Sequence, residues 1–286
     1  MGKPLESILD GAGTRWRFQC HLITPMKFIP SLLLSLSVLG ATAAFAADAP
    51  KKAAPKKATA PALPAQPADV AAPKLGPDGK VNAGFAKSHE AFLAEAKKGE
   101  AQVVFLGDSI TAGWNNQKPL FEKEYAQYKA VNFGIGGDRV QHVLWRVENG
   151  EFEGIKPKAV VLMIGTNNAG IADNSPEQIA AGIKNIIDVI HKRSAGTKIL
   201  LLAIFPRGEK EYPKLNQGRA KNQAVNAIIS KFDDGKLVHY FDIGAKFLQA
   251  DGTLTKEIMP DFLHPKEKGY QIEADAIREK LASLAK

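Results

Sequence analysis

The chain has 286 residues, of which 45% are hydrophobic and 24% are charged, a composition ordinary for one sizeable globular domain with an appendage. Its formal net charge is +8, and part of this excess comes from lysines between residues 51 and 57. No known nucleic-acid-binding motif and no cluster of basic and aromatic residues accompanies the charge, so we predict no nucleic-acid partner.

The first part of the chain has the pattern of an export signal. A short basic start at Met26-Lys27 precedes an apolar run that ends in the A-x-A pattern of residues 44–46. This order is typical of a secretory signal peptide, so we assign residues 26–46 to one and expect a periplasmic or secreted mature protein. A membrane anchor is the disfavoured alternative, because the run 28–39 is short for a span of about 20 residues.

We interpret residues 1–25 as an extension ahead of the true start. They contain the only cysteine, Cys20, so the mature chain would have neither a disulfide bond nor a thiol nucleophile. Residues 47–78 are rich in Ala, Pro and Lys and carry little bulky apolar surface, which predicts a flexible linker. Two interpretations of this basic linker stay open: weak association with an anionic wall or membrane surface, and a solvated spacer. The catalytic domain is assigned to residues 79–286.

Within this domain, apolar runs typical of buried strands alternate with segments of helical apolar spacing. One predicted helix opens with a capping box at residues 175–178 and a proline at its first position. Alternation of this kind predicts a parallel sheet with helices on both faces. The predicted class is α/β, a three-layer α/β/α sandwich with a flavodoxin-like sheet of about five strands in the order 2-1-3-4-5. The predicted strands are 102–106, 130–133, 159–164, 199–205 and 237–241, and the main predicted helices are 85–96, 120–125, 140–147, 179–190, 225–232 and 265–284.

The first predicted strand ends in Gly107-Asp108-Ser109, which would deliver a serine to the carboxyl edge of the sheet, where such sheets bind ligands. Taken alone, this serine is more often a helix N-cap than a nucleophile. Ester hydrolysis through a serine also needs a base and a group that orients the base. Asp261 and His264 fit these roles, because they share one turn of a proline-flanked loop that would face a cleft. The weaker candidates are His89, His142 and His191 on predicted helices, and His239 in a strand.

Two further turns would supply donors to the oxyanion of the reaction intermediate. The predicted donors are the backbone N–H groups of Ser109 and Gly137 and the side-chain amide of Asn167. Glycine lets backbone approach a substrate closely, and Asn offers two uncharged donors. Each turn alone would be interpreted as structural. A dinucleotide site is disfavoured, because Arg139 stands where G-x-G-x-x-G requires its third glycine.

The motifs at Gly107-Asp108-Ser109, Gly137, Asn167 and His264 occur together in this chain, which therefore resembles the SGNH, or GDSL, hydrolases. Over residues 83–286 it is more closely similar to the catalytic alpha subunits of the intracellular platelet-activating-factor acetylhydrolase. The resemblance implies a triad of Ser109, Asp261 and His264, an oxyanion hole completed by Gly137 and Asn167, a flavodoxin-like sheet, short acyl substrates and no metal or other cofactor. A homodimer is expected by analogy alone. The motifs that carry the similarity are 107–109, 132–139, 142–146, 165–168, 206–210 and 261–264.

We therefore predict an exported serine ester hydrolase that removes short acyl groups, acetyl above all, from a small acylated substrate such as an acetylated saccharide. The export signal distinguishes this chain from the cytosolic animal enzymes and leaves phospholipid, lysophospholipid and thioester substrates open. A non-catalytic carbohydrate- or wall-binding module on the same fold is the alternative, supported only by the basic linker. A flavodoxin-like nucleotide-binding protein is disfavoured, because the chain has no phosphate-binding loop.

Overall fold

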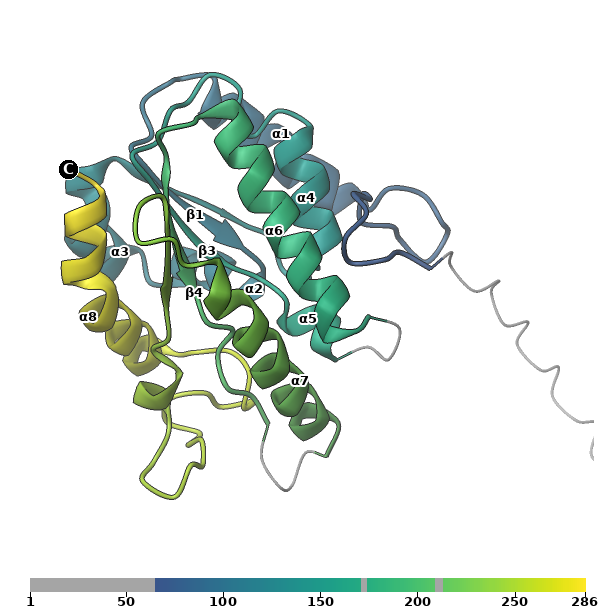
Figure 1. Ribbon diagram of the computed structural model, residues 1–286, viewed down its shortest axis with the longest axis vertical. Coiled ribbons are helices and arrows are strands. Elements are labelled where there is room, and N and C mark those ends of the chain that lie inside the picture. The colour runs from purple at the N-terminus through teal and green to yellow at the C-terminus, as the bar shows by residue number, and fades with distance from the viewer. Residues whose placement is uncertain (1–64, 171–173, 209–212) are drawn as a thin grey trace, which may run out of the picture. The chain divides into compact units, whose positions relative to one another are not determined.

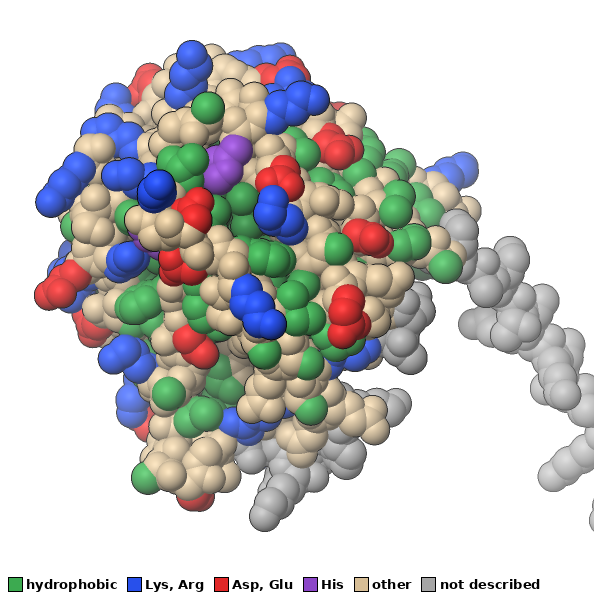
Figure 2. Space-filling model, viewed as in Figure 1, with side chains coloured by type: hydrophobic (Ala, Val, Ile, Leu, Met, Phe, Trp, Pro, Cys, Tyr) green, Lys and Arg blue, Asp and Glu red, His purple; other side chains and the backbone are tan. Residues whose placement is uncertain are grey.

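The computed structural model describes residues 65–170, 174–208 and 213–286. The predicted extension, the predicted signal peptide and most of the predicted linker lie outside these residues. No helix in the described ranges is both long enough and apolar enough to cross a bilayer. On the face drawn in Figure 2, basic and acidic side chains are interspersed, so the positive charge is not gathered into one patch there.

Five parallel strands form one sheet in the order β2-β1-β3-β4-β5, which confirms the predicted order. In the register, Gly107 at the end of β1 pairs with Gly134 of β2 and Met163 of β3. The carboxyl ends of these three strands are therefore level, and the residues that follow them meet at one edge. The strand bounds are β1 Val103–Gly107, β2 Ala130–Gly134, β3 Ala159–Met163, β4 Lys198–Leu202 and β5 Val238–Phe241.

Helices cover both faces of the sheet and enclose two apolar cores. Successive strand side chains point to opposite faces, so Val104 packs in one core and Val103 in the other. This confirms the three-layer sandwich. One face carries α1 (Ala83–Ala96), α4 (Val140–Glu148), α6 (Pro176–Arg193) and α7 (Pro213–Ile229), and the other carries α3 (Lys118–Tyr125) and α8 (Glu267–Leu284) (Figure 1). The short helices are α2 (Ser109–Ala112) and α5 (Thr166–Ala169), with 3₁₀ turns at Gly113–Asn116, Ala126–Tyr128, Ser230–Phe232 and Gly244–Phe247.

Helix α7 begins at Pro213, well before the predicted start at 225. The part of α7 before residue 225 lacks the apolar stripe on which that prediction depended, because it packs against polar groups at the edge of the sheet. There the Asn222 amide donates to the backbone oxygen of Phe205 at 3.1 Å. The side chain of Asn222 is therefore buried although it is polar.

The predicted linker differs from the structure at its C-terminal end. Residues 65–82, which we call the N-terminal arm, pack against the domain, so the linker boundary at residue 78 is wrong. Ala68 is fully buried, and a Cβ on Gly182 would come within 2.2 Å of its carbonyl oxygen. Gln141 Nε2 donates to the Gln66 carbonyl oxygen at 2.9 Å. The arm docks through small residues and backbone hydrogen bonds, which an Ala/Pro-rich composition does not reveal.

Candidate active site

Ser109 is the first residue of α2, directly after β1. The N-cap of this helix is Asp108, whose Oδ1 accepts a hydrogen bond from the Ile110 N–H at 2.9 Å. The turn needs glycine ahead of it, because a Cβ on Gly107 would lie 2.2 Å from Thr111 Oγ1. Asp108 thus fills the capping role that was the structural alternative for Ser109, and leaves the serine hydroxyl to other contacts.

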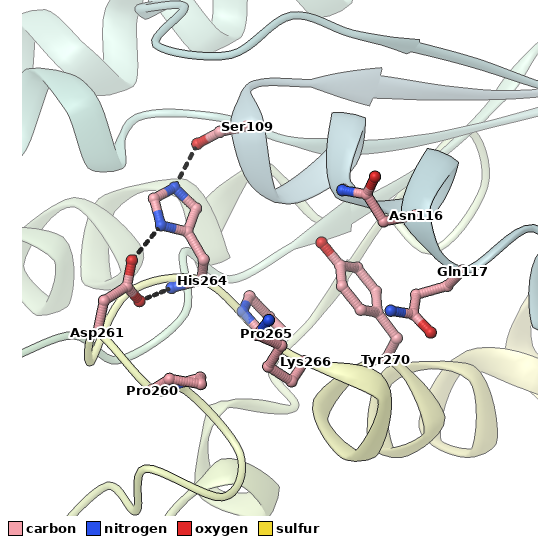
Figure 3. A pocket seen from close by; sticks show the side chains of 10 residues that line it. Ser109, Asn116, Gln117, Pro260, Asp261, His264, Pro265, Lys266 and Tyr270 are labelled. Atoms are coloured by element: carbon pink, nitrogen blue, oxygen red, sulfur yellow. Dashed lines mark hydrogen bonds and ion pairs between the residues drawn. The ribbon is translucent and has the colours of Figure 1, made fainter.

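His264 links Ser109 to Asp261. Its Nε2 lies 2.8 Å from Ser109 Oγ and its Nδ1 lies 2.6 Å from Asp261 Oδ2 (Figure 3). The second oxygen of Asp261 accepts from the backbone N–H groups of Leu263 at 3.1 Å and His264 at 2.8 Å. An ionised carboxylate only accepts hydrogen bonds, so Nδ1 carries the ring proton and Nε2 accepts from the serine hydroxyl.

The surroundings of Asp261 favour its ionised form. Partial burial alone would raise the pKa of Asp261, but hydrogen bonds from the ring and backbone of His264, together with the imidazole charge, outweigh burial and hold that pKa below its usual value. Between the two residues, Phe262 has φ +55°, which is uncommon for a bulky side chain. Its buried ring and a hydrogen bond from the Gly208 N–H to its carbonyl oxygen at 2.8 Å hold this turn.

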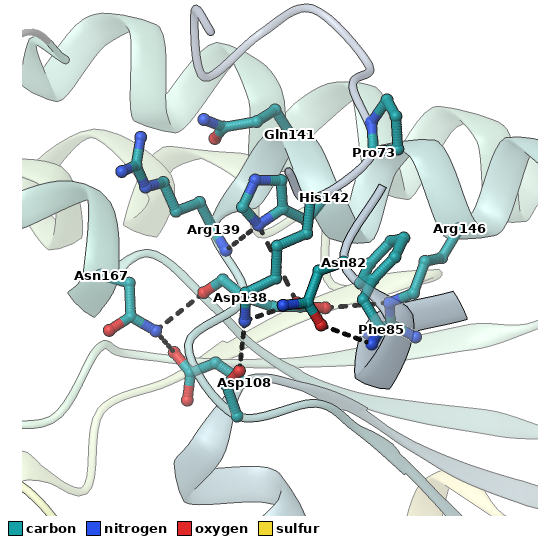
Figure 4. A network of polar contacts seen from close by, with 12 residues as sticks. Pro73, Asn82, Phe85, Asp108, Asp138, Arg139, Gln141, His142, Arg146 and Asn167 are labelled. Atoms are coloured by element: carbon teal, nitrogen blue, oxygen red, sulfur yellow. Dashed lines mark hydrogen bonds and ion pairs between the residues drawn. The ribbon is translucent and has the colours of Figure 1, made fainter. Parts of the chain in front are cut away.

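The other two predicted site residues lie at the same edge. Gly137 has φ +73°, in the left-handed region that favours glycine. Asn167 follows β3, and its Nδ2 donates to the Asp138 carbonyl oxygen at 2.8 Å (Figure 4). The same nitrogen lies 3.5 Å from Asp108 Oδ2, at the limit of a hydrogen bond. One N–H of Asn167 therefore holds the glycine loop, and the other is only weakly engaged.

A buried arginine supports this loop, and sequence reasoning gave it no role. Arg146 of α4 is fully buried and donates to Asp138 Oδ2 at 3.0 Å and to Glu151 Oε2 at 2.6 Å. It also donates to the backbone oxygens of Phe133 and Gly107, at the ends of β2 and β1. Burial alone would lower the pKa of Arg146, but the two carboxylates outweigh it. An arginine three residues after Val143, on the inward face of a predicted amphipathic helix, is the signal that could have identified it.

Arg207 connects two of the turns. Its Nη1 donates to the Thr166 carbonyl oxygen at 2.6 Å and to Thr166 Oγ1 at 3.0 Å, directly before Asn167. Its side chain is buried, and its Nε has no hydrogen-bond partner among the described residues. Burial lowers the pKa of Arg207. The next residue, Gly208, donates its N–H to the Phe262 carbonyl oxygen. Arg207 and Gly208 therefore hold both the turn that carries Asn167 and the turn that carries Asp261 and His264.

The histidines that we considered weaker candidates make structural contacts. Burial lowers the pKa of His142 to about 3, and its Nδ1 accepts from the Arg139 N–H at 3.1 Å. Its approach to Asp138 at 3.9 Å is therefore not an ion pair. The other three pair with Glu151 (His89), the Thr197 carbonyl oxygen (His191) and the Lys236 carbonyl oxygen (His239).

A pocket of about 380 Å³ opens beside Ser109 and His264 (Figure 3). Tyr270 forms one wall, and its hydroxyl donates to the Ile110 carbonyl oxygen at 2.7 Å. Neither the Asn116 nor the Gln117 carboxamide is hydrogen-bonded to another side chain in the described part of the chain. The polar groups that line the pocket are those of Ser109, Asn116, Gln117, Asp261, His264, Lys266 and Tyr270.

Known proteins resemble the chain in sequence and in fold. The model of the GDSL-like lipase/acylhydrolase family matches residues 105–272. Platelet-activating factor acetylhydrolase IB subunit alpha1 from Homo sapiens is 37% identical over 196 residues, covering 68% of this chain and 82% of that protein. Platelet-activating factor acetylhydrolase IB subunit alpha2 from Rattus norvegicus is 36% identical over 196 residues, which again cover 68% of this chain and 82% of that protein.

Solved structures share the fold at lower identity. A GDSL-like lipase from Bacteroides thetaiotaomicron is 20% identical with a TM-score of 0.57, covering 68% of this chain and 97% of that chain. Est24, a carbohydrate acetylesterase from Sinorhizobium meliloti, is 18% identical with a TM-score of 0.51, covering 64% of this chain and 99% of that chain. At these identities the likeness concerns the fold alone.

Proposed function

The chain belongs to the GDSL-like lipase/acylhydrolase family of carboxylic ester hydrolases, and we propose that it removes short acyl groups, acetyl above all, through Ser109. The observation that carries this proposal is the hydrogen-bonded series Asp261–His264–Ser109. It supplies a nucleophile, a base and a group that orients the base, which are the requirements of serine catalysis.

In the proposed mechanism, Ser109 Oγ attacks the ester carbonyl carbon while His264 Nε2 accepts the hydroxyl proton. The tetrahedral intermediate then collapses, the bond to the alcohol oxygen breaks, and Nε2 gives its proton to the leaving alcohol. Water attacks the acyl-enzyme through the same base, and the proton returns to Ser109. Asp261 stabilises the transient imidazolium and keeps the ring oriented.

The proposed oxyanion donors are the backbone N–H groups of Ser109 and Gly137 and the weakly engaged N–H of Asn167. Such donors are effective because they are oriented before the charge develops. Two contacts support this preorganisation. Asp138 is held by Arg146 at 3.0 Å, and Asn167 holds the carbonyl oxygen of Asp138 at 2.8 Å.

The pocket bears on the alcohol part of the substrate. It adjoins His264, which in the mechanism protonates the leaving alcohol, so we assign the pocket to that alcohol. The carboxamides of Asn116 and Gln117 offer donors there, and these suit an alcohol that carries further hydroxyl groups. We therefore propose an acetylated saccharide as the substrate, reached after export through the signal peptide 26–46.

A lipid ester is the second candidate. The relatives at about 37% identity are platelet-activating factor acetylhydrolase subunits, and the Lys266 ammonium suits the phosphate of a phospholipid headgroup. The two candidates make different demands on the pocket, because a saccharide needs the carboxamides of Asn116 and Gln117, whereas a headgroup phosphate needs Lys266.

The test is hydrolysis of p-nitrophenyl esters from acetate to octanoate by residues 47–286, beside Ser109→Ala and the exposed-serine control Ser283→Ala. We expect acetate to be preferred, with turnover lost only in Ser109→Ala. No Ser109-dependent turnover on any ester would refute the proposed mechanism and favour a binding module.

Two further variants, Gln117→Ala and Lys266→Met, then distinguish the two alcohols on an acetylated oligosaccharide and an acetyl phospholipid. Gln117→Ala should raise KM for the saccharide, and Lys266→Met should leave that KM nearly unchanged. If instead Lys266→Met raises KM for the phospholipid and Gln117→Ala leaves that KM nearly unchanged, the lipid ester is favoured.

A further inference from the structure

The N-terminal arm carries a lysine onto the glycine loop of the site. Lys74 Nζ donates a hydrogen bond to the carbonyl oxygen of Gly136 and lies 3.8 Å from Asp138 Oδ1. A Cβ on Gly137 would lie 3.0 Å from the same nitrogen. The side chain of Lys74 is only 22% exposed, so the ammonium is partly enclosed against this loop.

The backbone of the arm is fixed on both sides of Lys74. Before it, the Ala72 N–H donates to the Gln141 carbonyl oxygen at 3.2 Å. After it, the Asn82 N–H donates to the Lys74 carbonyl oxygen at 2.8 Å, and Leu75 forms an antiparallel bridge with Val81. The ammonium is therefore presented from an ordered backbone, which lowers the entropy lost when the side chain binds.

The carbonyl that Lys74 binds belongs to the peptide group that carries the Gly137 N–H. A peptide unit is planar and trans, so its C=O and N–H point in opposite directions. An anchor on the Gly136 oxygen therefore fixes the direction of the Gly137 N–H. This anchor matters here because glycine stands on both sides of the peptide, and glycine permits backbone rotations that other residues resist.

We propose that Lys74 is a positioning residue for ester hydrolysis, which holds the Gly136–Gly137 peptide so that the Gly137 N–H faces the oxyanion. The inference rests on the proposed function. A cationic donor on the carbonyl also polarises the peptide, and so strengthens its N–H as a donor.

A purely structural role for Lys74 is the competing explanation. Asp138 Oδ1 is buried with no hydrogen-bond partner in the described ranges, and the ammonium compensates its charge. Burial raises the pKa of Asp138 to about 6 even though the charges of Arg146 and Lys74 oppose this shift. A structural role predicts a loss of stability, whereas a positioning role predicts a selective loss of turnover.

The experiment compares Lys74→Met, Lys74→Arg and the control Lys80→Met, which changes an exposed lysine of the same arm. Lys74→Met should lower kcat for the acetate ester by about tenfold to a hundredfold, with KM changed little, because one of three oxyanion donors is misdirected. Lys74→Arg should recover most of the loss, because a guanidinium donates to the same oxygen. Lys80→Met should match the wild type.

A methyl trifluoromethyl ketone supplies a second readout. Ser109 Oγ adds to its carbonyl carbon, the π pair moves to the oxygen as an oxyanion, and the hydroxyl proton goes to His264. Its affinity for Lys74→Met should fall by the same factor as kcat. A wild-type kcat in Lys74→Met overturns the inference, as does a lower melting temperature with unchanged ketone affinity. Turnover that survives Ser109→Ala overturns the proposed function as well, so the two failures are distinguishable.

Discussion

Replacing Asp261 with Asn tests whether the orientation of the His264 ring controls the reaction. Oδ1 of Asp261 accepts from two backbone N–H groups, at 2.8 and 3.1 Å, while Oδ2 faces His264 Nδ1 at 2.6 Å. The amide of Asp261→Asn can keep its oxygen on the backbone, but its NH₂ group then faces Nδ1. Nδ1 must accept instead of donate, which moves the ring proton to Nε2 and prevents that atom from accepting the proton of Ser109.

The magnitude depends on how far water can compensate. In a serine protease with a buried aspartate, the same change lowers kcat by about 10⁴. Here the Asp261 side chain is 56% exposed and that of His264 is 42% exposed. Water can therefore replace part of the lost interaction, and we expect a smaller loss, about 10²–10³ in kcat.

The assay is kcat for the acetate ester, beside Asp261→Ala and thermal unfolding of each variant. Asp261→Ala should lose less kcat than Asp261→Asn, because water can accept from Nδ1 when no NH₂ group faces it. It should lose more stability, because the turn at His264 loses its acceptor. A wild-type kcat in Asp261→Asn would refute the reasoning, and so would a larger kcat loss in Asp261→Ala at equal stability.

Asn167→Ala should lower kcat by about 10²–10³ with KM nearly unchanged, and a change confined to KM would contradict an oxyanion role. Arg146→Met removes the buried guanidinium from both Asp138 and Glu151, so the free energy of unfolding in urea should fall by about 3–5 kcal/mol. A loss well below 1 kcal/mol would mean that the network contributes little, since exposed pairs are worth about that much. Burial raises the pKa of Glu273 from 4.5 to about 8, so between these values the folded state keeps a proton that the unfolded chain releases. Wild-type stability should therefore fall as pH rises through this window, by up to about 1.4 kcal/mol per unit. Glu273→Gln should lose the part of this slope that Glu273 contributes, so its stability relative to the wild type should increase toward pH 8. Parallel pH profiles of the two proteins would contradict the assignment.

Much of the fold could be predicted from local pattern. The run at residues 159–163 is apolar throughout because both faces of β3 are covered, and the Ser175 capping box marks the start of α6 through contacts within one turn. The same logic extended to part of the site. In a parallel sheet the residues after neighbouring strands meet at one edge, so the turns of Ser109, Gly137 and Asn167 could be expected together.

Tertiary structure decided which of these groups touch, and what supports them. The contact of Ser109 with His264 joins residues 155 apart, and that of Lys74 with Gly136 joins residues 62 apart. Composition suggested a linker for the arm, because Ala, Pro and Lys offer little apolar surface, yet the arm docks through backbone hydrogen bonds and a close approach that Gly182 permits. Local pattern records periodicity and residue type, whereas these contacts depend on surfaces that exist only after the sheet and helices have packed.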